Sequence, residues 1–182
     1  METNLCVAGF GGQGVMTLGK FLADATCNAT DKNVTFFPSY GAEQRGGTAN
    51  CFVVISDGMI GAPLGDVMDD LIVMNGPSLQ KFLPTLKEGG TLFINSSIVD
   101  EAEIDRTDVK VVKAPVTGLA LEMGNAKVLN VIMLGVYVGY TEVVPPEVVW
   151  ETIEHKLGSK PKLLPLNKAA FEKGLELGRS QR

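Results

Sequence analysis

The sequence predicts an α/β fold: a single doubly wound, mainly parallel sheet with helices on both faces. Short apolar segments rich in β-branched and aromatic residues alternate along the chain with longer segments of helical periodicity. This alternation is typical of strands joined by right-handed helical crossovers. A length of 182 residues, with 45% hydrophobic and 20% charged residues, suits one well-buried domain spanning residues 1–182.

The first part of the chain is expected to contribute three strands and one helix. Residues 5–8 form an uninterrupted apolar run that predicts a strand, and a glycine-rich turn leads from it into helical periodicity over residues 15–28. Residues 34–37 and 51–55 are short and rich in β-branched or aromatic side chains, which favours strands.

The second part is expected to contribute three further strands and five helices. The strands are short apolar runs with turn residues at their ends, at residues 71–74, 91–94 and 109–112. The helices show the longer period, and several are opened by Ser, Asn or Pro and closed near Gly; they lie at residues 78–87, 116–123, 126–140, 146–157 and 166–177.

Two local patterns predict how these elements pack. The turn at residues 56–58, Ser-Asp-Gly, could fold residues 59–60 back as a hairpin and place an antiparallel pair at one edge of the sheet. Gly135 and Gly139 form a GxxxG pattern in an apolar stretch, residues 128–138, that is too short to span a bilayer. The pattern therefore predicts close packing of two helices.

Composition disfavours several classes of function. A net charge of −5 and a pI near 4.9 disfavour a nucleic-acid-binding protein, which normally presents a basic face. Cys6, Cys27 and Cys51 are far apart and form no CxxC pair, so they predict neither an iron–sulfur cluster nor a structural zinc site. Separated thiols and the lack of a signal-peptide pattern at the start of the sequence favour the reducing cytoplasm.

The remaining polar side chains offer no catalytic group or metal site. His155, the single histidine, lies on a charged helical face, where a solvated side chain is expected rather than a catalytic base. Asp66, Asp69 and Asp70 are interpreted as caps of the turn before the strand at residue 71 rather than as metal ligands. Gly65-Asp66 is not followed by the second glycine that a thiamine diphosphate motif needs, and Asn75 follows it too closely for that motif.

The first glycine-rich segment predicts a phosphate site. Gly9, Gly11 and Gly14 satisfy the GxGxxG pattern between a strand and a helix, in a Rossmann-like context where the N–H groups of Gly12 and Gln13 can also meet an anion. A nicotinamide or flavin site should carry an acid after the second strand, which here ends in Phe-Phe-Pro. A phosphate or pyrophosphate of another ligand is thus favoured, and glycines that merely allow close helix packing are the alternative.

The second glycine-rich segment, residues 39–47, places Tyr40, Glu43 and Arg45 before the pair Gly46 and Gly47. Those glycines let the backbone approach another surface, although a solvated loop with incidental charges would show the same composition. Loops that follow parallel strands leave the same edge of a sheet, so both glycine-rich loops are expected to border one crevice. Asn95 follows the fifth strand at this edge, either as a ligand-facing side chain or as a cap.

These motifs together resemble the gamma subunit of 2-oxoacid:ferredoxin oxidoreductases. The resemblance runs nearly end to end; its most specific part is the second loop, and it also includes residues 9–14, 75–77, 125–135, 167–171 and Gly174. The short chain most resembles the gamma subunit of the 2-oxoglutarate enzymes. The resemblance implies an oxidative decarboxylation of a 2-oxoacid with coenzyme A (CoA) to acyl-CoA, carbon dioxide and reduced ferredoxin. It also implies that thiamine diphosphate, Mg²⁺ and iron–sulfur clusters belong to alpha, beta and delta-type partner subunits.

Within such an assembly we expect this chain to supply part of the CoA surface and to help close the active site at a subunit interface. The backbone of residues 11–14 would donate to phosphate, Arg45 would pair with a phosphate or a partner's carboxylate, and Tyr40 and Glu43 would orient neighbouring groups. A structural subunit that binds no ligand is the alternative, as is specificity for pyruvate, indolepyruvate or 2-oxoisovalerate.

Overall fold

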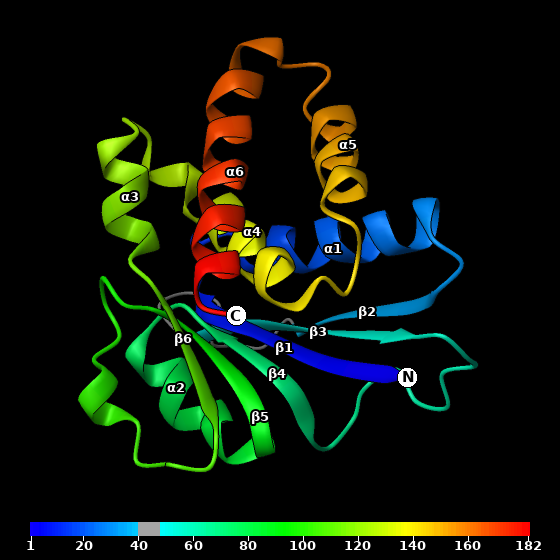
Figure 1. The fold of residues 1–182 in the computed structure, drawn as a ribbon, viewed down its shortest axis with the longest axis vertical. Helices are drawn as coiled ribbons and strands as arrows, with labels where there is room; N and C mark the ends of the chain where they lie inside the picture. The colour runs from blue at the N-terminus through cyan, green and yellow to red at the C-terminus, as the bar shows by residue number, and fades with distance from the viewer. Residues whose placement is uncertain (40–47) are drawn as a thin grey trace.

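The computed structural model describes residues 1–39 and 48–182 and contains one six-stranded sheet (Figure 1). The strand order is β2-β3-β1-β4-β5-β6. The strands are β1 (Glu2–Phe10), β2 (Asn33–Ser39), β3 (Thr48–Ser56), β4 (Met68–Val73), β5 (Leu86–Asn95) and β6 (Lys110–Ala114). Three of the pairings are parallel and two are antiparallel, which confirms the predicted mainly parallel sheet.

Helices cover both faces of the sheet, as predicted (Figure 1). The helices are α1 (Val15–Ala29), α2 (Gly76–Phe82), α3 (Val116–Glu122), α4 (Leu129–Thr141), α5 (Pro146–Lys156) and α6 (Leu164–Ser180). Figure 1 shows α1, α4, α5 and α6 above the sheet and α2 below it. Within the described residues, no helix is both long enough and apolar enough to cross a membrane.

The predicted hairpin after residue 56 is wrong. Strand β3 lies between β1 and β2 and is antiparallel to both, so Ser56 already pairs with Glu2 on one side and Asn33 on the other. A returning strand would find no free edge there. Met59 is accordingly 94% exposed and belongs to no strand.

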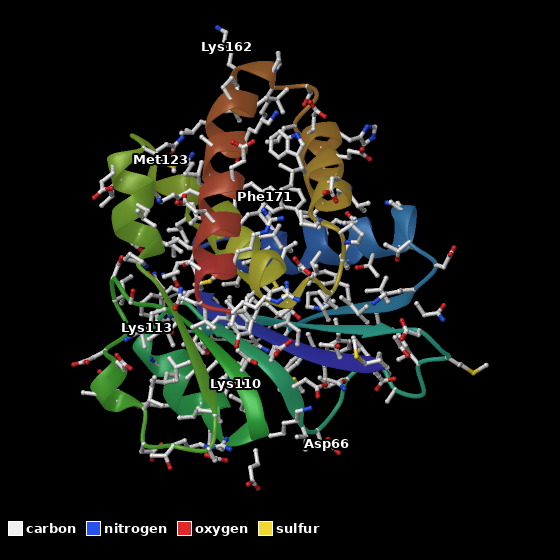
Figure 2. All side chains as sticks on the ribbon, viewed as in Figure 1. Asp66, Lys110, Lys113, Met123, Lys162 and Phe171 are labelled. Carbon is white, nitrogen blue, oxygen red and sulfur yellow. The ribbon has the colours of Figure 1, made fainter. Side chains whose placement is uncertain are left out.

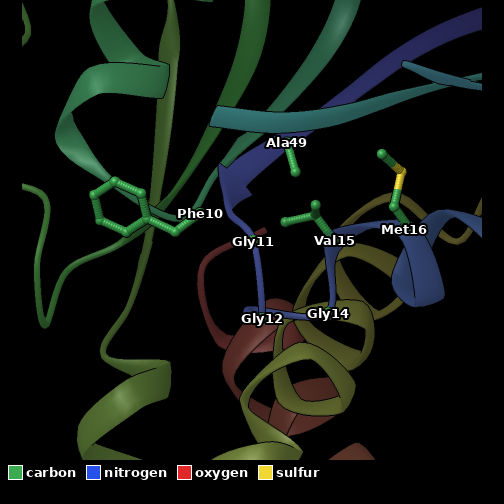
Figure 3. A pocket seen from close by; sticks show the side chains of 7 residues that line it. All are labelled: Phe10, Gly11, Gly12, Gly14, Val15, Met16 and Ala49. Atoms are coloured by element: carbon green, nitrogen blue, oxygen red, sulfur yellow. The ribbon is translucent and has the colours of Figure 1, made fainter. Parts of the chain in front are cut away.

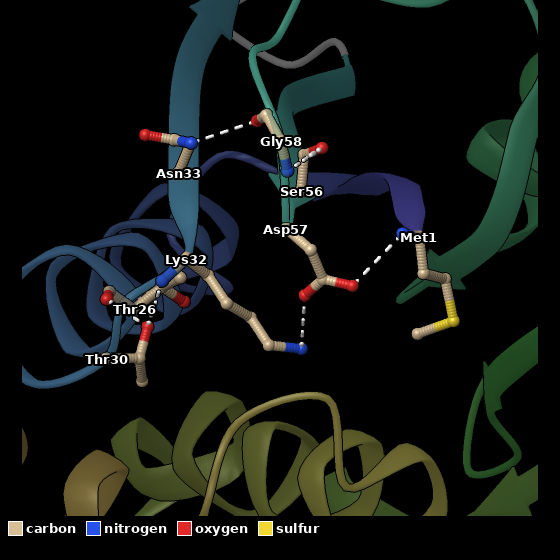
Figure 4. Close-up of polar contacts among 8 residues, drawn as sticks. All are labelled: Met1, Thr26, Thr30, Lys32, Asn33, Ser56, Asp57 and Gly58. Atoms are coloured by element: carbon tan, nitrogen blue, oxygen red, sulfur yellow. Dashed lines mark hydrogen bonds and ion pairs between the residues drawn. The ribbon is translucent and has the colours of Figure 1, made fainter.

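Polar contacts hold the turn at the end of β3 (Figure 4). The Asp57 carboxylate accepts a hydrogen bond from the amino group of Met1 at 3.0 Å and pairs with Lys32 Nζ at 3.6 Å. These two cations hold the pKa of Asp57 below its usual value. The Asn33 side chain donates to the carbonyl of Gly58 at 2.9 Å, which fixes the turn against β2.

The predicted helix over residues 78–87 ends early. Helix α2 stops at Phe82, a 3-10 turn spans Leu83–Thr85, and β5 already begins at Leu86. Pro84 explains the change, because proline has no N–H for the next helical bond and its ring crowds the preceding turn. Leu86 then pairs with Met68 of β4 instead of continuing the helix.

The apolar core has two parts. The larger part lies between the sheet and helices α1, α4, α5 and α6, and the smaller part lies between the other face and α2. At the outer end of the larger part, Phe171 of α6 points toward α5 (Figure 2), where its ring stacks on Trp150 with centroids 6.3 Å apart.

Helices α4 and α6 cross with their backbones in contact, which confirms the close packing predicted from Gly135 and Gly139. A Cβ atom on Gly135 would lie 2.4 Å from the Phe171 carbonyl oxygen, and one on Gly174 would lie 2.0 Å from the Ile132 carbonyl oxygen. Only glycine permits this approach, since such contacts fall far below van der Waals distance.

A buried polar pair connects α4 to the sheet. The Tyr137 hydroxyl of α4 donates to the Asp70 carboxylate of β4 at 3.0 Å, and both side chains are buried. Burial raises the pKa of Asp70 to about 6, although the Tyr137 hydrogen bond opposes this rise. Asp69 and Asp70 both lie within β4, so the prediction that they cap a preceding turn is wrong.

Candidate functional site

The glycine loop, residues 9–14, joins the end of β1 to the start of α1. It turns sharply, with the Gln13 N–H donating to the Phe10 carbonyl at 3.2 Å. Gly12 and Gly14 have φ values of +92° and +71°, a region that other residues adopt only with strain. Gly14 is the N-cap of α1, and none of the described side chains caps that helix. The first-turn N–H groups therefore remain available to a ligand.

The Gln13 side chain fastens this loop to the sheet. Its Oε1 accepts from the Phe10 N–H at 2.7 Å, and its Nε2 donates to the Met74 carbonyl at 3.2 Å. A Cβ atom on Gly9 would lie 2.7 Å from Gln13 Oε1 and 2.8 Å from Met74 Cβ. Gly9 thus serves close packing, whereas Gly12 and Gly14 serve the shape of the turn.

A cavity of about 340 Å³ opens beside the glycine loop (Figure 3). Its lining residues are Phe10, Gly11, Gly12, Gly14, Val15, Met16 and Ala49. Figure 3 shows the Phe10 ring on one side of the turn and the side chains of Val15, Met16 and Ala49 on the other. The cavity thus combines apolar walls with the positive end of a helix, which suits a ligand with anionic and apolar parts.

Tyr40, Glu43, Arg45, Gly46 and Gly47 lie outside the described residues. The residues that flank them are described: Ser39 pairs with Asn50, and Thr48 pairs with Phe10 at the end of β1. Strands β1 and β2 run in the same direction, because both are antiparallel to β3. The second segment therefore starts and ends at the sheet edge that carries the glycine loop, as predicted.

Asn95 is fully buried at the same edge. Its Nδ2 donates to the Met74 carbonyl at 3.4 Å and to Thr117 Oγ1 at 2.9 Å, and its Oδ1 accepts from the Ser97 N–H at 3.3 Å. The Asn95 side chain thus joins the ends of β4 and β5 to helix α3. Because Gln13 also binds the Met74 carbonyl, this one oxygen links the loops that follow β1, β4 and β5.

Sequence reasoning missed several residues of this site. Asn130 of α4 donates from Nδ2 to the Gly14 carbonyl at 3.3 Å, and Phe10, Met16 and Ala49 line the cavity. One signal was present for Asn130, since it interrupts an otherwise apolar helix. Nothing in the sequence indicates Ala49, which reaches the cavity only through the pairing of β3 with β1.

Comparisons with known proteins identify the family. Residues 4–177 match the family model described as pyruvate ferredoxin/flavodoxin oxidoreductase. The chain belongs to this oxidoreductase family. Among curated members, it is 36% identical to ketoisovalerate oxidoreductase subunit VorA of Methanothermobacter thermautotrophicus over 98% of its own length, but it spans only 37% of VorA. It is 32% identical to 2-oxoglutarate synthase subunit KorC of Methanocaldococcus jannaschii, covering 98% of this chain and 95% of KorC.

Two solved structures of this oxidoreductase family share the fold. The gamma subunit of a keto/oxoacid ferredoxin oxidoreductase from Geobacter sulfurreducens superposes with a TM-score of 0.88 and 26% identity, over 100% of this chain and 98% of that subunit. The 2-oxoglutarate:ferredoxin oxidoreductase from Magnetococcus marinus, solved with 2-oxoglutarate, coenzyme A and succinyl-CoA bound, gives a TM-score of 0.91 and 26% identity. This chain covers 32% of the matched Magnetococcus chain. The predicted resemblance to gamma subunits is confirmed.

Proposed function

We propose that this chain is the gamma subunit of a cytoplasmic 2-oxoacid:ferredoxin oxidoreductase, which converts a 2-oxoacid and CoA into acyl-CoA, carbon dioxide and reduced ferredoxin. Its match to nearly the full length of a separate gamma subunit supports this assignment. Alpha, beta and delta-type partners would carry thiamine diphosphate, Mg²⁺ and the iron–sulfur clusters.

Within that enzyme, the proposed role of the chain is to bind part of CoA and to close the active site against its partners. The observation that carries this proposal is the cavity between the glycine loop and β3, where first-turn N–H groups meet apolar walls. A phosphate of CoA would take the helix end, and the pantetheine arm would follow the apolar side. The bound CoA of the Magnetococcus enzyme supports this choice of ligand.

The proposed contacts come from both glycine-rich segments. The backbone of Gly11, Gly12 and Gly14 would donate to phosphate, while Gln13 holds the loop through its side chain and through its N–H, which is bonded to the Phe10 carbonyl. From the second segment, Arg45 would pair with a second phosphate, Tyr40 and Glu43 would orient neighbouring groups, and Gly46 and Gly47 would allow the close approach. Asn95 would act indirectly, by joining the strand ends.

Replacing Met16 with glutamate tests the CoA site. Met16 lies in the first turn of α1 and lines the cavity. A carboxylate there favours the helix but repels a bound phosphate, so we expect the KM for CoA to rise about tenfold in the reconstituted complex. Met16→Gln is the matched control, because it has the same length and polarity without the charge, and its KM for CoA should stay within about twofold of wild type.

Equal KM values for CoA in the Met16→Glu and Met16→Gln complexes would contradict the proposal. Unchanged binding of CoA together with intact assembly would instead favour a structural subunit that bridges its partners without contacting the ligand.

The proposed substrate is 2-oxoglutarate, because the chain covers 95% of the length of KorC. The higher identity to VorA favours 2-oxoisovalerate as the second candidate. We expect the reconstituted complex to show its highest kcat/KM with 2-oxoglutarate when it is compared with 2-oxoisovalerate, pyruvate and indolepyruvate under CoA saturation. A preference for any of the other three would identify that 2-oxoacid as the substrate instead. It would not contradict the assignment of this chain as a gamma subunit.

A further inference from the structure

Asn130 is a polar residue in an apolar environment. It is only 7% exposed, and most of helix α4 around it is buried and apolar. A buried amide is unfavourable unless its polar atoms are hydrogen-bonded. Both are: Oδ1 accepts from the Val131 N–H at 3.0 Å, and Nδ2 donates to the Gly14 carbonyl at 3.3 Å. The second bond joins residues 116 positions apart and ends on the glycine loop.

The fit between Asn130 and the glycine loop is close. A Cβ atom on Gly14 would lie 2.5 Å from Asn130 Nδ2, so the bond requires the glycine as well as the asparagine. The Gly14 carbonyl also accepts the first bond of helix α1, from the Leu18 N–H at 2.9 Å. Asn130 therefore holds the peptide group at which the loop becomes a helix.

The direction of that peptide group matters for the cavity. In a trans peptide, the carbonyl of Gly14 and the N–H of Val15 point in opposite directions. With the carbonyl drawn toward α4, the Val15 N–H points away from α4, at the end of α1 that borders the cavity. The bond from Asn130, together with the helical bond from Leu18, thus orients a donor of the proposed phosphate site.

Helix α4 provides a rigid support for Asn130. It is fixed against α6 by the close glycine crossing at Gly135 and Gly174, and against β4 by the bond from Tyr137 to Asp70. Groups that must hold a ligand precisely are best supported by packed elements of this kind.

We infer that Asn130 is a positioning residue for CoA, which holds the Gly14 carbonyl toward α4 so that the first-turn N–H groups of α1 stay directed at the cavity. This inference rests on the proposed function, because it takes CoA as the ligand of that cavity. Asn130 does not itself line the cavity and acts through the loop.

The test uses the reconstituted complex with Asn130→Asp, which keeps the acceptor for Val131 and removes the donor to Gly14. We expect the KM for CoA to rise about five- to tenfold, with kcat at saturating CoA within about twofold and the KM for the 2-oxoacid unchanged. The serine of Asn130→Ser is uncharged and too short to reach the loop. This variant should likewise raise the KM for CoA without a comparable change in kcat or in the KM for the 2-oxoacid.

Asn167→Asp is the matched control. Asn167 is 8% exposed, and its Nδ2 also donates to a backbone carbonyl, but to that of Leu163, the residue just before α6, rather than to the glycine loop. The Asn167→Asp variant should leave the KM for CoA unchanged. The inference is overturned if the Asn130 variants keep the wild-type KM for CoA, or if Asn167→Asp raises it equally.

Two further readouts separate this inference from the proposed function. If Met16→Glu raises the KM for CoA and the Asn130 variants do not, the proposed CoA site is supported and the positioning role of Asn130 is contradicted. If Met16→Glu leaves the KM for CoA unchanged, the proposed CoA site is contradicted. Hydrogen exchange in the full chain then still decides whether Asn130 orders the loop. Exchange at the bonded amides of Gln13 and Leu18 should be faster in Asn130→Asp than in Asn167→Asp, and equal rates would overturn the inference.

Discussion

Replacing Gly174 with alanine is expected to lower the free energy of unfolding by about 3 kcal/mol or more. The new Cβ atom would lie 2.0 Å from the Ile132 carbonyl oxygen and 2.8 Å from the Cα of Gly135. Both are backbone atoms, so no side chain can rotate away, and helices α4 and α6 must separate. The loss should exceed the gain of about 1 kcal/mol that alanine brings to a helix. Denaturant unfolding of the full chain measures the difference.

Gly118→Ala is the control for this prediction. Gly118 also lies inside a helix, α3, but its added Cβ atom would meet only Ser97 Oγ at 3.5 Å. This variant should be as stable as wild type or more stable by up to about 1 kcal/mol, because only the helix propensity changes. A comparable loss of stability in both variants would show that the crossing of α4 and α6 is not the cause.

Replacing Asp70 with asparagine is expected to stabilise the protein at neutral pH. Burial raises the pKa of Asp70 from 3.8 to about 6. The folded state therefore holds this proton more tightly than the unfolded state, and the contribution of Asp70 to stability is greatest below pH 4 and is lost as the pH rises to about 6. The loss amounts to about 3 kcal/mol. Asparagine keeps an acceptor for the Tyr137 hydroxyl without the charge, so the stability of the variant relative to wild type should increase by about this amount between pH 4 and pH 7.

Asp69→Asn is the control with the opposite sign. Although partial burial works against it, hydrogen bonds from Lys87 and Asn4 keep the pKa of Asp69 below its usual value. Its carboxylate stabilises the fold at neutral pH, and this contribution is lost in acid. Unfolding is measured at pH 3, 4, 5, 6 and 7. Relative to wild type, Asp70→Asn should gain stability as the pH rises from about 4 to 7, whereas Asp69→Asn should gain stability as the pH falls below about 4. A pH-independent difference for Asp70→Asn would contradict the role of its ionisation.

The sheet and its helices could be predicted because strands buried on both faces appear as continuous apolar runs. The same property left the direction of β3 undetermined, because the apolar run at residues 51–55 fits a parallel and an antiparallel strand equally well. The false hairpin followed from this ambiguity: local turn chemistry at residues 56–58 gives no sign that both edges of β3 are already paired.

The glycine loop could be predicted, but its surroundings could not. Positive φ values at Gly12 and Gly14 agree with the phosphate-loop pattern in the sequence. The Gln13 side chain, in contrast, is used within the fold, and Asn130 reaches the loop from 116 residues away. Contacts of this range depend on how α4 packs, which no local pattern encodes.

The three thiols differ enough in environment to give the chain a built-in labelling position. Cys6 and Cys51 are buried, and burial raises the pKa of Cys51 to about 12 and that of Cys6 further, which leaves almost no reactive thiolate at neutral pH. Cys27 is exposed near the far end of α1, about 20 Å along the helix from Gly14. A maleimide fluorophore should therefore attach to the wild-type chain at one site, remote from the glycine loop, and report by energy transfer on how the subunit joins its partners.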